Sequence, residues 1–273
     1  MGLRGRKHQR GYKGTPSVIP DYVERRLRAA LPDGCGVVPG STPVVAFGDP
    51  GVARVATLGL NPSRREFLDG SGRELNGPAR RFETLASLAL PGLKTAPNEA
   101  LLAVLIACNE YFSRNPYRKW FDQLEAILRT IGASYYDGTA CHLDLVQWAT
   151  DPTWNLLSKH ARKTLLATDR EFFLDQLSRE SIQLLLLNGS GVIRQVQDTL
   201  DRPLRESTVR VSVRSVTTHF FTGAIAKVPV VAWSTNLQSS FGVSNDLRAK
   251  IAEHVAMLAQ SATVSTGRSA SGS

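Results

Sequence analysis

Residues 54–63 read Arg54-Val-Ala-Thr-Leu-Gly-Leu-Asn61-Pro62-Ser63. The apolar part is typical of a short strand buried in a sheet. The strand must stop at Pro62, because proline has no N–H to donate to a sheet ladder and favours an extended backbone at the residue before it. We therefore expect Asn61 at the carboxyl end of a core strand, the edge where open α/β sheets bind ligands. In the simpler alternative, Asn-Pro is only a turn signal.

Three further apolar segments resemble strands and alternate with segments of helical spacing. These segments are residues 139–146, 182–187 and 229–233. The alternation predicts an α/β protein, a three-layer α/β/α sandwich around a mostly parallel four-stranded sheet. Two local features are also expected: residues 43–47 pair with residues 54–60 as a hairpin, and residues 78–90 form a helix that begins with Pro78.

The two ends of the chain differ from its middle in composition. Residues 1–17 are expected to be a disordered basic arm, residues 18–260 a single domain, and residues 261–273 a disordered tail rich in Ser, Thr and Gly. The net charge is +9, and the segment from Met1 to Arg28 holds eight Lys or Arg against two acidic residues. Such a segment indicates a polyanionic partner, nucleic acid first. A tail that only keeps the protein soluble is the alternative.

Cysteine spacing and hydropathy bear on the class of protein. Cys35, Cys108 and Cys141 lie far apart and form no CxxC pair, so neither a disulfide framework nor a cysteine metal site is expected. The sequence has no apolar run of membrane-spanning length, and its basic start lacks the apolar core of a signal peptide. These features favour a reducing cytoplasm, and we expect a monomer without cofactor, metal or membrane contact.

Polar residues follow each of the four apolar strands. The four corners are Asn61-Pro62-Ser63, residues 144–150, Asn188-Gly-Ser-Gly191 and residues 234–240. Parallel strands place such corners at one edge of a sheet, where they form one site. This convergence favours a functional site more strongly than any single motif.

Asp144 is the acidic residue of an otherwise apolar strand. His142 lies two residues before it and therefore points to the same face. A buried carboxylate needs partners or a function. The alternative is a structural carboxylate that caps a neighbouring loop. Glu66, in the loop after Asn61, is expected to face solvent, although it is close enough in sequence to approach a ligand.

The corner at Asn188 has a Gly-x-Gly spacing between a strand and a helix. A dinucleotide-binding motif needs a third glycine at position 194, which is Arg194. A tight strand-to-helix connection, with amides exposed to a phosphate or a base edge, is therefore favoured over a cofactor site.

Together these corners resemble the uracil-DNA glycosylase superfamily, nearest its mismatch-specific branch. Residues 59–63 are similar to the motif Gly-Ile/Met-Asn-Pro-Gly, and residues 78–82 to Pro-Ala-Asn-Arg-Phe. Residues 141–148, 184–189 and 230–239 correspond in order to the second strand, the third strand and the last motif. The resemblance covers about residues 44–258.

Three features depart from the superfamily pattern. Ser234-Thr235-Asn236 stands where the last motif has His-Pro-Ser or Asn-Pro-Ser, and Asp144 replaces an Asn of the second strand. The four cysteines of the branches with an iron–sulfur cluster are absent, so no cluster is expected. These changes affect the expected substrate more than the expected fold.

The resemblance implies a monofunctional DNA glycosylase that binds double-stranded DNA. Such an enzyme flips a nucleotide out of the duplex and hydrolyses its N-glycosidic bond to leave an abasic site. Asn61 would hold the attacking water, and Asp144 would act as a base or stabilise the cationic sugar. The implied base pocket consists of Ser63, Phe67, His142, Gln147 and Asn188, with Phe67 stacked on the base. The implied DNA-binding residues, with Leu237 as a wedge, are Pro62, Arg64, Arg65, Gly189, Ser190, Ser234, Asn236, Leu237, Gln238 and Ser239.

Ser63 bears on the excised base. In the uracil-specific branch a Tyr at this place blocks substituents at the 5-position of the pyrimidine. A small Ser implies a 5-substituted pyrimidine, such as the glucosylated hydroxymethylcytosine of phage DNA that divergent bacterial members remove in antiviral defence. The alternatives are a uracil or G·T/U mismatch glycosylase in base-excision repair, an inactive glycosylase-fold DNA-binding module, and a hydrolase of small nucleotides.

Overall fold

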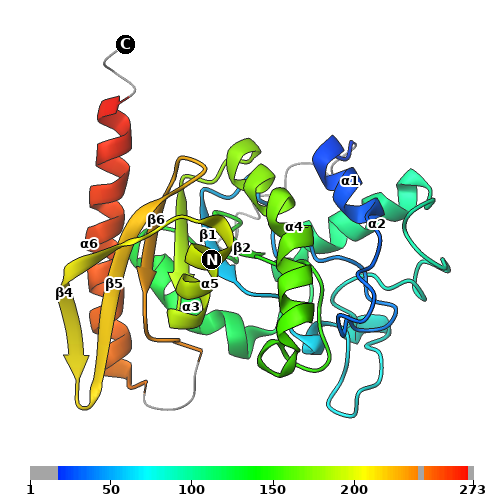
Figure 1. Ribbon diagram of the computed structural model, residues 1–273, viewed down its shortest axis with the longest axis horizontal. Coiled ribbons are helices and arrows are strands. Elements are labelled where there is room, and N and C mark those ends of the chain that lie inside the picture. The colour runs from blue at the N-terminus through cyan, green and yellow to red at the C-terminus, as the bar shows by residue number, and fades with distance from the viewer. Residues whose placement is uncertain (1–17, 239–242, 270–273) are drawn as a thin grey trace, which may run out of the picture.

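A six-stranded mixed sheet runs through the middle of the protein (Figure 1), in the strand order β2-β1-β3-β6-β5-β4. The computed structural model describes residues 18–238 and 243–269, so the predicted arm over residues 1–17 lies outside it. The strands are β1 (Val55–Gly59), β2 (Ala140–Asp144), β3 (Leu184–Asn188), β4 (Arg205–Val213), β5 (Val216–Ile225) and β6 (Val228–Trp233). The α-helices are α1 (Asp21–Arg28), α2 (Asn98–Asn109), α3 (Arg118–Thr130), α4 (Lys159–Arg179), α5 (Ser190–Leu200) and α6 (Asn245–Ser269).

The sheet has two parts that differ in strand direction. Strands β2, β1, β3 and β6 are parallel to one another, whereas β5 runs antiparallel to β6 and β4 antiparallel to β5. The α/β class agrees with the sequence prediction, but the predicted number of four strands is wrong. The hairpin of β4 and β5 extends the sheet beyond β6 (Figure 1).

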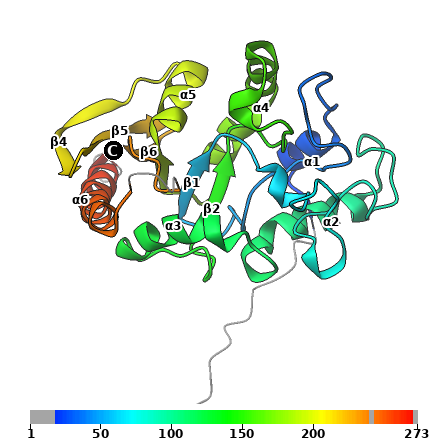
Figure 2. The same ribbon diagram turned by 90° about the horizontal axis from the view of Figure 1, so that it is seen from below.

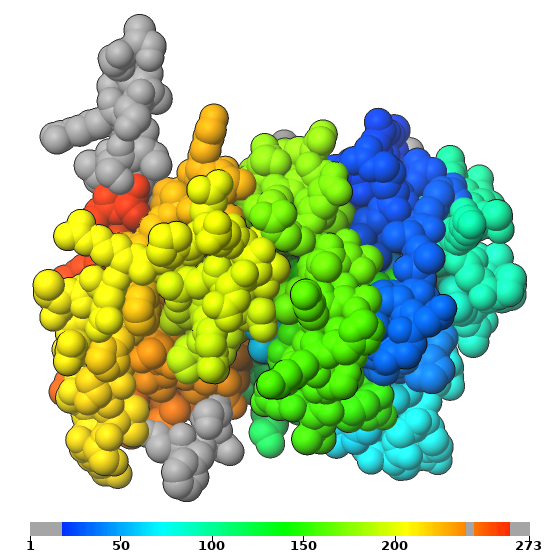
Figure 3. Space-filling model, viewed as in Figure 1, coloured from blue at the N-terminus to red at the C-terminus, as the bar shows by residue number. Residues whose placement is uncertain are grey.

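Helices cover both faces of the sheet. Figure 2 shows α4 and α5 on one face and α3 and α6 on the other, and Figure 3 shows α4 and α5 side by side at the surface. Successive residues of a strand point to opposite faces. In β3, Leu185 and Leu187 pack into the core under α4 and α5, while Leu184 and Leu186 pack into the core on the other face. This double covering explains why β3 is a continuous apolar run.

Three local predictions need correction. Residues 43–47 form no hairpin with β1, because Phe47 exchanges both backbone hydrogen bonds with His142 of β2, at 2.9 Å each. Residues 78–90 form no α-helix; a 3₁₀ turn over Gly77–Ala79 is followed by further turns. The last helix continues to Ser269, beyond the expected boundary at residue 260.

Three arginines of the basic amino-terminal segment form ion pairs within the protein. Arg25, Arg26 and Arg28 of α1 pair with Asp175, Asp169 and Glu24, at 3.7, 2.9 and 2.8 Å. Three of the eight cations before residue 29 therefore have intramolecular partners.

None of the helices in the described part of the chain combines the length and apolar character that a membrane span requires.

Candidate active site

The carboxyl ends of β1 and β2 lie side by side. The parallel register pairs Gly59, the last residue of β1, with Asp144, the last residue of β2. The chain beyond Gly59 turns at Asn61-Pro62, as the sequence predicts. This geometry brings two of the predicted polar corners to one place.

A cavity of about 70 Å³ lies at this edge. The predicted site residues that line it are Asn61, Pro62, Ser63, His142 and Asp144. Its other walls are Glu66 and the aromatic residues Phe47, Tyr117, Trp120 and Phe121. The site therefore combines one amide, two carboxylates and an imidazole inside an aromatic enclosure.

The Asn61 side chain is held in one orientation. Its Nδ2 donates to the carbonyl oxygens of Pro62 and Trp148, at 3.1 and 3.2 Å, and to Oγ1 of Thr150 at 3.0 Å. These acceptors fix which end of the amide carries the nitrogen. The side-chain oxygen Oδ1 is thus the atom of Asn61 left to accept a hydrogen bond from a ligand or a water.

Asp144 belongs to a buried polar chain. Its Oδ1 lies 3.4 Å from Nε2 of His142, whose Nδ1 lies 2.7 Å from Oγ1 of Thr57, and Thr57 in turn bonds the hydroxyl of Tyr135 at 2.6 Å. Burial raises the pKa of the Asp144 carboxyl, while the hydrogen bond from His142 opposes that rise. The structural partner that a buried carboxylate needs is therefore His142.

Gly59 is required by the position of Asp144. A Cβ atom at residue 59 would lie 2.3 Å from Oδ1 of Asp144 and 2.9 Å from Nε2 of His142. A Cβ atom does not come this close to other side-chain atoms in proteins, so both side chains would have to move. The glycine of this corner thus allows the carboxylate and the imidazole to lie across the end of β1.

Glu66 is the site residue that the sequence prediction missed. It lies in a 3₁₀ turn over Arg64–Glu66, and its side chain is buried rather than facing solvent. Its Oε2 accepts a hydrogen bond from the Tyr111 hydroxyl at 2.8 Å and lies 3.8 Å from Nε of Arg81. Burial raises the pKa of Glu66 to about 7, against the opposing effects of Arg81 and Tyr111. The following apolar pair, Phe67-Leu68, was the signal that this loop returns to the core.

The aromatic walls are not those that were predicted. Phe67 is 2% exposed and stacks on Phe82, with ring centroids 5.7 Å apart, so it belongs to the core and does not line the cavity. The aromatic rings around His142 are Phe47, Trp120 and Phe121, with centroids 5.3, 5.1 and 5.3 Å from the imidazole. Trp120 and Tyr117 are half-buried and line the cavity, so they replace Phe67 as candidates to stack on a ligand.

Gln147 also lies outside the cavity, because its polar groups are used in the fold. Its Nε2 donates to the Asp144 carbonyl oxygen at 2.8 Å, its Oε1 accepts from Nε of Arg26 at 3.0 Å, and its backbone N–H donates to Asp169 at 2.8 Å. Gln147 therefore joins α1 and α4 to the end of β2 and is not part of a base pocket.

Asn188 holds the corners after β3 and β6 together. Its Oδ1 accepts from the Trp233 indole at 2.9 Å and from the Leu237 N–H at 3.0 Å, and its Nδ2 donates to the side chains of Asn236 and Gln238 at 3.0 and 2.8 Å. All four of its hydrogen bonds are internal. The predicted role of reading a base edge is therefore replaced by a structural one.

The predicted DNA-binding residues divide by exposure. Leu237 is 0% exposed and packs in the core, so it cannot act as a wedge in this conformation. Pro62 and Gly189 are also buried. Arg64 forms an ion pair with Asp151 at 2.9 Å, and the Ser234 hydroxyl accepts a hydrogen bond from the His219 N–H. The exposed members are Arg65, Ser190 and Asn236, while Gln238 is half-buried. Ser239 lies outside the described residues.

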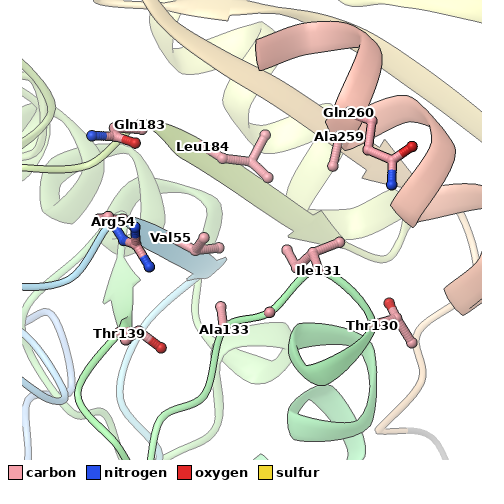
Figure 4. A pocket seen from close by; sticks show the side chains of 11 residues that line it. Arg54, Val55, Thr130, Ile131, Ala133, Thr139, Gln183, Leu184, Ala259 and Gln260 are labelled. Atoms are coloured by element: carbon pink, nitrogen blue, oxygen red, sulfur yellow. The ribbon is translucent and has the colours of Figure 1, made fainter. Parts of the chain in front are cut away.

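A second cavity, of about 390 Å³, lies at the opposite edge of the sheet (Figure 4). It opens beside Val55 and Leu184, the first residues of β1 and β3, and α6 contributes Ala259 and Gln260. Among the described residues that line it, Arg54 is the only charged one. This larger space lacks the cluster of carboxylate and imidazole groups found at the carboxyl edge.

Neither a protein-family model nor a curated protein matches this chain. The functional argument therefore depends on the residues and geometry of the cavity at the carboxyl edge. Both predicted catalytic residues, Asn61 and Asp144, line that cavity. Two of the five predicted base-pocket residues, Ser63 and His142, also line it.

Proposed function

We propose that the protein is a monofunctional DNA glycosylase of the uracil-DNA glycosylase type. The observation that carries this proposal is the cavity in which the Asn61 amide and the Asp144 carboxylate meet at the ends of two parallel strands. In this proposal the four parallel strands β2-β1-β3-β6 correspond to the sheet of that superfamily, and the hairpin of β4 and β5 is an addition to it.

The geometry supports hydrolysis of an N-glycosidic bond. With its nitrogen occupied, Asn61 offers Oδ1 to a water below the sugar. Asp144 accepts the proton of that water or stabilises the positive charge that develops on the sugar, and His142 keeps the carboxylate in place. The aromatic walls exclude bulk water, and a flipped base can stack on the half-buried rings at the mouth.

We propose a 5-substituted pyrimidine, with glucosylated hydroxymethylcytosine as the favoured target. Ser63 is exposed and also lines the cavity, so a substituent at the 5-position has a path past its small side chain to solvent. The cavity of about 70 Å³ has little space to enclose a sugar in addition to a base. In this proposal the protein removes modified cytosines from phage DNA in the cytoplasm, as an antiviral defence.

Basic surface supports a DNA partner. A groove of about 400 Å³ between α4 and α5 carries Lys159, Arg162, Lys163 and Arg170. None of these four forms an ion pair within residues 18–238 and 243–269. Unpaired cations contribute to phosphate binding, and such binding weakens steeply with added salt. A hydrolase of small nucleotides would show little dependence on salt.

A panel of duplexes tests the proposal. Each duplex carries glucosylated hydroxymethylcytosine, uracil or a G·T mismatch at one position, and abasic sites are detected by alkaline cleavage of the strand. We expect cleavage of the modified-cytosine duplex. Cleavage of the uracil or mismatch duplex alone would establish the repair alternative, and DNA binding without any base release would establish the inactive module.

Ser63→Tyr tests whether the opening beside Ser63 admits a substituent at the 5-position of the base. A tyrosine at this exposed position would cover the mouth and obstruct the path of a 5-substituent. We expect release of glucosylated hydroxymethylcytosine to fall at least about 10-fold, an effect of the size seen for misfit in a binding pocket. Ser63→Ala is the matched control, since it keeps the mouth open, and should preserve the rate. Equal loss with both variants would show that the hydroxyl, rather than the opening, matters.

A further inference from the structure

We propose that Glu66 is the proton donor to the leaving base, and that the site is thereby built for cytosine-type bases. This inference rests on the proposed glycosylase function and adds to it a residue and a chemical reason for a cytosine-type base. Cytosine is a poorer anionic leaving group than uracil, because an amino group replaces the second carbonyl over which uracil spreads the charge. An enzyme that releases cytosine therefore gains more from protonating it.

The position of Glu66 fits this role. It lines the same cavity as Asn61 and Asp144, and its side chain is 3% exposed. A hydrogen bond from the Tyr111 hydroxyl at 2.8 Å holds Oε2 in place, and the Tyr111 hydroxyl is itself fixed by the N–H of Tyr117 at 2.9 Å. A carboxyl group in this setting is positioned toward the enclosed space and shielded from bulk water.

The charges around Glu66 decide its protonation. Arg81 lies 3.8 Å away and favours the ionised form, as does the Tyr111 hydrogen bond, whereas burial and the negative charge of Asp144 favour the protonated form. Burial has the largest effect and raises the pKa of Glu66 to about 7. Two carboxyl groups in one cavity can thus take different roles, Glu66 as acid and Asp144 as base.

The reaction balances with these two residues. Glu66 gives its proton to N3 of the cytosine as the C1′–N1 bond breaks, and the electron pair of that bond remains on N1. The water held by Asn61 forms the new C1′–O bond and loses a proton to Asp144. The products are a free neutral base and an abasic site, and the proton returns from Asp144 to Glu66 through solvent.

Glu66→Gln tests the inference, since glutamine keeps the shape but has no acidic proton. We measure single-turnover base release from modified-cytosine, unmodified-cytosine and uracil duplexes, from pH 5.5 to 9. The wild-type rate on the best cytosine duplex should fall as the pH rises through about 7, because deprotonated Glu66 cannot donate. Glu66→Gln should lower the cytosine rate about 100-fold or more and remove this alkaline decrease. The uracil rate should change far less.

Two further variants keep the test decisive. Tyr111→Phe removes the hydrogen bond that favours ionised Glu66, so the alkaline decrease should move to higher pH. Glu110→Gln, at an exposed carboxylate paired with Arg114, is the matched control and should leave the profile unchanged. A Glu66→Gln enzyme that binds DNA and retains the wild-type cytosine rate would overturn the inference, as would equal losses on cytosine and uracil. Wild-type protein that releases no base from any duplex would instead overturn the proposed function.

Discussion

Asn61→Ala should abolish base release while DNA binding persists. Alanine removes Oδ1, the acceptor that we assign to the attacking water, and we expect the single-turnover rate to fall at least about 100-fold. The DNA-binding surface that we propose consists of other residues, so the dissociation constant for duplex should stay close to the wild-type value. Base release is measured by alkaline cleavage, and binding by fluorescence anisotropy on the same preparation.

The same substitution also affects the fold, and this requires a control. Loss of the Asn61 amide leaves the Trp148 carbonyl oxygen without that donor, and such losses cost about 1–3 kcal/mol. Thr150→Val removes one of the same hydrogen bonds but keeps the Asn61 side chain. It should lower thermal stability to a similar extent and retain most of the activity. Equal activity losses in both variants would mean that Asn61 only supports the structure.

Gly59→Ala should remove the Asp144 carboxylate from its working position. The new Cβ would lie 2.3 Å from Oδ1 of Asp144 and 2.9 Å from Nε2 of His142, so these two side-chain ends would have to shift. A displacement of about 1 Å at a reacting group costs about 100-fold in rate, so we expect at least that loss. Overpacking at a buried site also destabilises by about 1–3 kcal/mol, which thermal unfolding measures.

Gly92→Ala is the matched control for this glycine. A Cβ at residue 92 meets no atom within 4 Å, so both stability and base release should remain at wild-type levels. A Gly59→Ala protein with full activity would show that Asp144 and His142 need not occupy their present positions. That result would remove Asp144 from the proposed mechanism.

The parts of the fold that the sequence predicts are those set by local patterns. The apolar runs of β1, β3 and β6 are sufficient to locate these strands within a few residues. Strand β5 is missed because Thr217, Thr218 and Gly223 interrupt its apolar pattern, although both of its edges are paired. The predicted hairpin between residues 43–47 and β1 is wrong. Phe47 pairs with His142 of β2 instead, and tertiary packing determines which strand it meets.

The site shows the same division. Asn61, Ser63 and Asp144 are predictable because strand ends converge at one edge of a parallel sheet. Glu66 was predicted to face solvent and Phe67 to stack on the base, and both predictions are wrong. The 3₁₀ turn places the carboxylate at the cavity and the ring in the core. Asn188, Gln147 and Leu237 have the residue types of a binding site, but their hydrogen bonds and burial assign them to the fold. A sequence pattern does not show whether a polar side chain bonds within the fold or faces a ligand.

The most direct test is release of a free base from modified duplex DNA under single-turnover conditions. A duplex with one glucosylated hydroxymethylcytosine is incubated with excess wild-type protein or with Asn61→Ala, and the small-molecule fraction is analysed by mass spectrometry. The proposal predicts free glucosylated base and an equal amount of abasic strand with the wild type, and neither with Asn61→Ala. Intact DNA with the wild-type protein on this duplex and on the uracil and mismatch duplexes would contradict the assignment of a DNA glycosylase.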